Sequence, residues 1–180
     1  MCDAQRNRLN EIITVMPVRI ANAVSQLKPE QKNDICEIRL RADKPVVAVT
    51  GKGCAFITDS GRLTYIISAS LITITKAEIS ETVKRVCGYS IYSHQEEIIN
   101  GFVTLRGGHR VGMAATAVTE NGKIISMRDI SSINIRVASE RKGTKAFPSC
   151  TFARYDLLRR NFVMLRSPRR RSEERRVGRE

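Results

Sequence analysis

Residues 101–112 constrain the fold most, because they read as two short strands joined by a reversal at Gly107 and Gly108. Glycine is the usual residue where φ must be positive or where another group approaches the backbone closely. His109 and Arg110 follow at once, so the pattern predicts a fixed turn that displays a cation. Such an arginine suits a phosphate or a partner's carboxylate. An ordinary hairpin with exposed polar residues is the alternative interpretation.

Helical and extended segments alternate around this turn. Apolar residues recur at helical spacing over residues 3–27, and Pro17 predicts a break between two short helices. Residues 28–30 are expected to be a second break. A β-rich region then begins, with period-two alternation and turn signals that predict four strands, at residues 35–40, 46–50, 55–58 and 63–67.

Two more short helices and further strands complete the body. Thr75 to Glu78 has the form of a capping box, and Ser93 to Glu96 repeats it. Asn121-Gly122 is a strong hairpin signal. It would join a strand over residues 113–118 to one over 123–127, and a last strand is expected at 133–138. The predicted class is α+β, with N-terminal helices followed by a mixed or antiparallel sheet with two short helices.

The positive charge is unevenly distributed. The chain carries a net charge of +13, of which residues 141–180 supply +9 and residues 1–140 only +4. We therefore expect one domain over residues 1–141 and a poorly ordered basic tail over 142–180. Arginine clusters of this kind can bind nucleic acid. A basic nucleic-acid-binding protein is therefore one candidate function.

Several charged residues on the predicted strands are candidate contacts. Alternation places Glu37, Arg39 and Arg41 on one face of a strand, while Arg128 lies near a strand end and Arg136 lies opposite an apolar face. Such cations could dock a second domain or subunit, or reach a nucleotide bound there. The alternative is solvated surface charge, in which an exposed ion pair contributes about 0–1 kcal/mol.

Other kinds of site have little support in the sequence. His94 and His109 lack metal-ligand spacing, and no Cys-x-x-Cys pair occurs, so no metal site is expected. Neither histidine is paired in sequence with a nucleophile, so no catalytic residue is assigned. No apolar run approaches the roughly 20 residues of a transmembrane helix. Gly51-Lys52-Gly53 is predicted to be a hairpin turn, because a phosphate loop needs Gly-x-x-x-x-Gly-Lys-[Ser/Thr].

In this order and at these spacings, four segments together resemble the amino-terminal half of the stage III sporulation protein AA family: Glu37 to Arg41, Tyr89 to Ser93, Gly107 to Arg110, and Arg128 to Arg136. Family members look like AAA+ ATPases of bacterial secretion systems, in which this region precedes a RecA-like core. The resemblance implies a cytoplasmic homo-oligomeric ring in the mother cell, which partners could hold peripherally at the membrane. Those partners would be membrane channel proteins of the sporulation complex.

The resemblance also suggests roles for particular residues. Four arginines are candidate contacts to nucleotide phosphate or to a neighbouring subunit: Arg39, Arg110, Arg128 and Arg136. The turn that supports them would be Gly107, Gly108 and His109. ATP and magnesium are the cofactors expected in full-length relatives, and none is expected for this chain.

The chain departs from the family's catalytic pattern. The phosphate-loop motif occurs nowhere in the 180 residues. We therefore predict that this polypeptide alone neither binds ATP tightly nor hydrolyses it. The tail would be either disordered or non-native sequence in place of a truncated ATPase core. The predicted function is the regulatory and oligomerisation domain of an ATPase that energises a channel between mother cell and forespore. A nucleotide-free interaction module is a further alternative.

Overall fold

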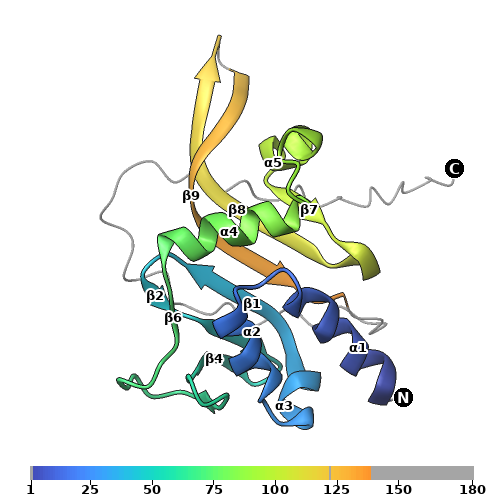
Figure 1. Ribbon diagram of the computed structural model, residues 1–180, viewed down its shortest axis with the longest axis vertical. Helices are drawn as coiled ribbons and strands as arrows, with labels where there is room; N and C mark the ends of the chain where they lie inside the picture. The colour runs from blue at the N-terminus through green and yellow to red at the C-terminus, as the bar shows by residue number, and fades with distance from the viewer. Residues whose placement is uncertain (1, 122, 139–180) are drawn as a thin grey trace, which may run out of the picture.

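The computed structural model describes residues 2–121 and 123–138 of the chain. Its centre is a seven-stranded sheet in the order β5-β4-β3-β1-β9-β8-β7, with every neighbouring pair antiparallel. Helices α1, α2 and α4 lie across the sheet, as Figure 1 shows. The predicted α+β class with a mainly antiparallel sheet is thus confirmed. The predicted tail lies outside the described residues.

Three helices open the chain: α1 (Cys2–Ile13), α2 (Val18–Ser25) and α3 (Pro29–Asp34). Pro17 separates the first two, as predicted, and its extended backbone is the N-cap of α2. The break expected at residues 28–30 lies at residues 26–28, and the helix α3, which was not expected, begins at Pro29. Proline is favourable in the first turn of a helix, where its missing N–H costs nothing. The backbone N–H of Lys28 donates to Gln31 Oε1 over 3.2 Å, which completes this helix start.

The strands are β1 (Ile35–Arg41), β3 (Val47–Thr50), β4 (Gly53–Ile57), β5 (Leu63–Thr64), β7 (Phe102–Thr104), β8 (Arg110–Glu120) and β9 (Lys123–Arg136). A separate pair consists of β2 (Lys44–Pro45) and β6 (Thr73–Ile74). The predicted hairpin turn at Gly51 to Gly53 is confirmed by the β3–β4 pairing. Strands β8 and β9 continue together beyond the rest of the sheet as a two-stranded arm (Figure 1).

Two predicted strands differ from the structure. The strand expected at 63–67 stops at Thr64, because the hydroxyl of Thr64 accepts the N–H of Ile66 over 3.2 Å and turns the chain. The two strands expected at 123–127 and 133–138 are one strand, β9, which ends at Arg136. Asp129 has a φ of 53° within it, where the pairing with β8 shifts register, so a β-bulge replaces the expected loop.

One of the two predicted capping boxes forms. The Thr75 hydroxyl accepts the N–H of Glu78 at the start of α4 (Lys76–Val86), and the Glu78 carboxylate accepts the N–H of Thr75 over 2.8 Å. Burial alone would raise the pKa of Glu78, but the hydrogen bonds from Thr75 and Arg19 lower it below its usual value. Charge in the first turn of α4 is therefore retained into mildly acidic conditions.

The second capping box is wrong. Residues Tyr92–His94 form a 3₁₀ turn, η1, which leads directly into the short helix α5 (Gln95–Ile99). Ser93 lies inside this turn, and its hydroxyl is 2.7 Å from the hydroxyl of Ser90 instead of bonding to a helical N–H. The preceding turn therefore already supplies a helical backbone at the position expected to be the cap.

The helices pack on one face of the sheet around a single apolar core. The sheet contributes Ile38, Leu40, Val111, Ile133 and Ile135, and the helices contribute Leu9, Ile12, Ile20, Val24, Ile79 and Val83. Side chains alternate between the two faces of a strand. Residues next to these core positions therefore lie on the opposite face of the sheet, where the predicted cations are found.

Candidate functional site

Three of the four predicted arginines share the sheet face that lies opposite the helices. Arg110 on β8 pairs directly with Arg136 on β9, and Arg136 pairs on its other side with Glu37 on β1. Arg39, two residues along β1, pairs with Asn134. We call the surface formed by Glu37, Arg39, Arg110 and Arg136 the arginine face. It assembles residues from three strands, of which β1 is far in sequence from the consecutive strands β8 and β9.

Two cations of the arginine face have identified neighbours. The Glu37 carboxylate accepts a hydrogen bond from Arg39 Nε over 2.7 Å. The Arg110 guanidinium carbon lies 5.4 Å from the centre of the Phe102 ring, within cation–π range. Arg110 and Arg136 are both exposed. Their side chains therefore lie next to each other on the same face of neighbouring strands.

Arg128 lies apart from the other three. It pairs with Thr116, six residues along β8 from Arg110, which corresponds to about 20 Å at the usual rise of a strand. The bulge at Asp129 separates it from the arginine face, and its side chain is exposed on the arm. The structure therefore brings together three of the predicted cations and leaves Arg128 on the arm.

The glycine turn has the predicted backbone. Gly107 and Gly108 have φ values of 75° and 78°, which favour glycine over any residue with a Cβ. The turn closes through a 2.8 Å bond from the N–H of Leu105 to the carbonyl of His109. A Cβ on Gly107 would collide with Glu11 Oε2 and would lie only 3.0 Å from His109 Nε2. The turn is therefore packed closely against α1.

His109 is not displayed beside Arg110 as the sequence suggested, because it is fully buried. Its Nδ1 accepts the N–H of Ala138 over 3.0 Å, so Nε2 carries the proton and donates to Glu11 Oε2, also over 3.0 Å. Arg8 Nη1 donates to the carbonyl of Ala138 over 3.3 Å. We call Arg8, Glu11, His109 and Ala138 the α1 clamp. It ties the first helix to the turn and to the residue that follows β9 by two positions.

Sequence reasoning missed the acidic half of this clamp. Glu11 and His109 are 98 residues apart, and Glu11 looks like any polar residue on a helix surface. The one available signal was the double glycine, which implies that something approaches the backbone there.

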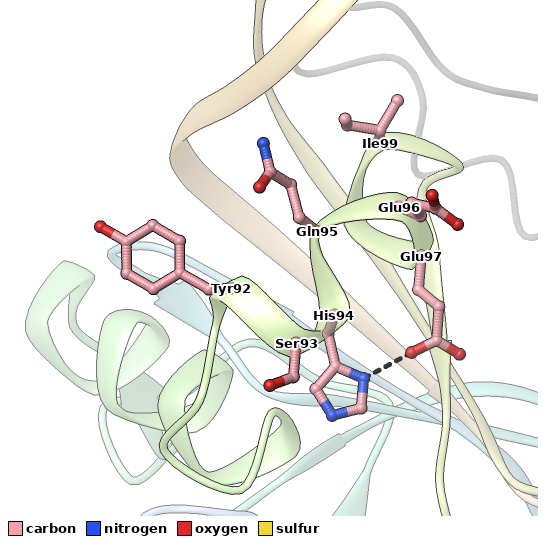
Figure 2. Close-up of a pocket in the computed structure, with 7 residues that line it drawn as sticks. All are labelled: Tyr92, Ser93, His94, Gln95, Glu96, Glu97 and Ile99. Atoms are coloured by element: carbon pink, nitrogen blue, oxygen red, sulfur yellow. Dashed lines mark hydrogen bonds and ion pairs between the residues drawn. The ribbon is translucent and has the colours of Figure 1, made fainter.

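A surface hollow lies around η1 and α5, with a volume of about 660 Å³. Its lining residues are Tyr92, Ser93, His94, Gln95, Glu96, Glu97 and Ile99. Figure 2 shows that these side chains spread outward around a short helical turn instead of converging, and that His94 is already bonded to Glu97. This hollow therefore has no focused set of groups that would hold a ligand.

Two further observations concern the described residues as a whole. Within residues 2–121 and 123–138, no group of three or more His, Cys, Asp or Glu side chains is arranged to hold a metal ion. In the same part of the chain, no helix is both long enough and apolar enough to cross a membrane.

An antiparallel sheet covered by helices on one face and carrying the arginine face on the other defines the fold class as α+β. The chain belongs to the family described as sporulation stage III, protein AA, which residues 5–154 match. It is similar to stage III sporulation protein AA of Bacillus subtilis (strain 168), with 36% identity over 135 residues. The predicted family assignment is thus confirmed.

The alignment covers 75% of this chain and 40% of the relative, so the chain spans less than half of that protein's length. No solved structure matches the chain. The family match extends to residue 154, beyond the boundary predicted at residue 141, and that boundary stays a prediction.

Proposed function

We propose that this chain provides the regulatory and oligomerisation domain of a sporulation-stage ATPase that energises a channel between mother cell and forespore. Family membership supports the sporulation role. The observation that supports the regulatory and oligomerisation role is the arginine face, where Arg110 and Arg136 lie directly opposite each other on neighbouring strands. Two guanidinium groups held side by side in this way suit an anionic group to which both can donate hydrogen bonds.

In this proposal, Arg110 and Arg136 contact an anionic group that belongs to the rest of the full-length protein. That group would be a phosphate of a nucleotide held by the following domain, or a carboxylate of a neighbouring subunit in a ring. Guanidinium groups bind both anions through paired hydrogen bonds. Arg39 would not bind the anion, because it already forms an ion pair with Glu37. It would instead orient Glu37 beside Arg110 and Arg136.

The α1 clamp would support this role by fixing how the chain leaves the domain. It holds Ala138, which follows the arginine-bearing end of β9, against α1 and the glycine turn. ATP and magnesium would be held by the ATPase part of a full-length protein in the cytoplasm of the mother cell. The partners would be further copies of the protein and membrane channel proteins.

A chimera tests this proposal. The matched region of this chain would replace the corresponding region of the Bacillus subtilis relative, in a strain that lacks its own copy. We expect heat-resistant spores from this strain, and at least a tenfold loss when Arg110→Gln and Arg136→Gln are combined. Arg128→Gln is the matched control, because it is an exposed arginine about 20 Å away. It is expected to leave the spore count unchanged.

Two results would contradict the proposal. One is a chimera that is folded and abundant yet forms no spores. The other is an equal loss for Arg128→Gln and for the double variant. The nucleic-acid alternative instead predicts steeply salt-dependent binding to DNA or RNA by this chain, lost when residues 142–180 are deleted.

A further inference from the structure

Glu96 and Glu97 on α5 are set apart from every other carboxylate side chain of the protein. All other Asp and Glu residues have a Lys or Arg within three positions in sequence, whereas no Lys or Arg lies between Arg85 and Arg106. A cation close to a carboxylate weakens the field that the carboxylate presents to a partner. Residues 86–105, which include η1 and α5, instead carry a net charge of −2 in a chain whose total is +13.

Glu96 is the member of this pair that can accept a new partner. Glu97 is bonded to His94. The Glu96 carboxylate is exposed, and within the described residues it forms neither a hydrogen bond nor an ion pair. Figure 2 shows that it points outward from the helical turn.

The surface hollow around η1 and α5 has a lining that suits a guanidinium group. Glu96 and Glu97 line it together with Tyr92, whose side chain is 90% exposed. Carboxylates bind a guanidinium through charge-assisted hydrogen bonds, and an aromatic ring attracts it through its π face. These groups do not converge on a small ligand, but they can receive an arginine that projects from a protein surface. We call this feature the acidic hollow.

Arg110 supplies a matching cation on the other side of the sheet. In the part of the chain that the structure describes, Arg110 contacts the ring of Phe102 and forms no ion pair. The acidic hollow belongs to the side that the helices cover, because Ile98 of α5 is buried in the core and α5 packs against β7 and β9 (Figure 1). The arginine face lies on the opposite side, so contact between Glu96 and Arg110 requires two molecules.

We infer that the acidic hollow of one copy of this chain receives Arg110 of the next copy, with Glu96 as its carboxylate partner. This inference rests on the proposed function, because it names the anion at the arginine face as a carboxylate of a neighbouring subunit. Opposite charges steer and orient such an encounter. Two different surfaces of the chain then meet in a heterologous contact, which generates a ring when the rotation closes.

Charge reversal at both positions tests this pairing with the full chain. Sedimentation velocity would measure self-association of the unmodified chain, of Glu96→Arg, of Arg110→Glu, and of the variant that carries both changes. We expect the unmodified chain to self-associate and each single reversal to raise the dissociation constant at least about tenfold. The double variant should return to within about threefold of the unmodified chain, because the opposite charges face each other again.

Recovery in the double variant also shows that the single variants are folded, since a misfolded chain would not regain association through a second reversal. Glu120→Arg and Arg128→Glu are the matched controls, because both residues are exposed charges on the β8–β9 arm. They are expected to leave the dissociation constant unchanged. The pairing would be overturned by single reversals without effect, by an equal loss in the controls, by a double variant that stays dissociated, or by an unmodified chain that remains a monomer.

ATP turnover by the chimera separates a failure of this inference from a failure of the proposed function. If the arginine face contacted a nucleotide phosphate, Arg110→Glu would lower turnover while Glu96→Arg left both turnover and assembly unchanged. That result would overturn the pairing and leave the proposed function standing. Loss of turnover in both single reversals, with recovery in the double variant, would support both.

Discussion

Replacing His109 with alanine is expected to lower the free energy of unfolding by about 3 kcal/mol. The side chain is fully buried and makes two hydrogen bonds, one from the N–H of Ala138 and one to Glu11. Its removal leaves a cavity and leaves the N–H of Ala138 without its acceptor, whereas the Glu11 carboxylate is 45% exposed and can bond to water instead. A polar group left without a partner away from water costs on the order of 1–3 kcal/mol, and the cavity adds to that cost.

Urea denaturation of the purified chain, followed by circular dichroism, measures this effect. His94→Ala is the matched control, because His94 is partly exposed and forms a local pair with Glu97. Its expected cost is below about 1 kcal/mol. If the two variants had equal free energies of unfolding, the hydrogen bonds of His109 would not stabilise the turn. The stabilising role of the α1 clamp would then be contradicted.

Gly107→Ala is expected to destabilise the fold by about 3 kcal/mol, against about 1 kcal/mol for Gly108→Ala. Both residues have positive φ, so both substitutions carry backbone strain. Only at Gly107 does the new Cβ collide with a clamp residue, because it would displace the Glu11 carboxylate from His109. At Gly108 the nearest atom is the Cβ of Ala138 at 3.8 Å, an ordinary contact.

The difference between these two variants therefore reports the packing of α1 on the turn. Thermal unfolding of both variants would be compared with that of the Gly107→Ala, Glu11→Ala double variant. This comparison separates the cost of backbone strain from the cost of the collision with Glu11. Removing the Glu11 side chain should narrow the gap between the two glycine variants. If the difference in stability between the two glycine variants stayed the same, the cost at Gly107 would come from backbone strain alone and not from contact with Glu11.

Local signals in the sequence predicted much of the fold. The capping box at Thr75, the break at Pro17 and the Asn121 turn each depend on residues close in sequence, and each is present. The strand predicted at 63–67 ends at Thr64, because the chain turns there and leaves the apolar residues Ile66 and Ile67 exposed. The continuity of β9 could not be anticipated, because a positive φ at Asp129 has no sequence signature.

The candidate site was only partly predictable for a different reason. Alternation along β1 correctly placed Glu37 and Arg39 on one face. Bringing Arg110 opposite Arg136 requires the register between β8 and β9, which the hydrophobic pattern and the turn set together. The partnership of Glu11 with His109 depends on tertiary packing alone, and no local pattern encodes it.

ATP turnover by the purified chimera tests the central claim most directly, with this chain alone measured alongside it. We predict background turnover for the chain alone, and turnover by the chimera that falls at least tenfold when Arg110→Gln and Arg136→Gln are combined. Arg128→Gln should retain full turnover. Hydrolysis by the chain alone, or a folded chimera whose turnover is indifferent to Arg110 and Arg136, would contradict the assignment of the arginine face.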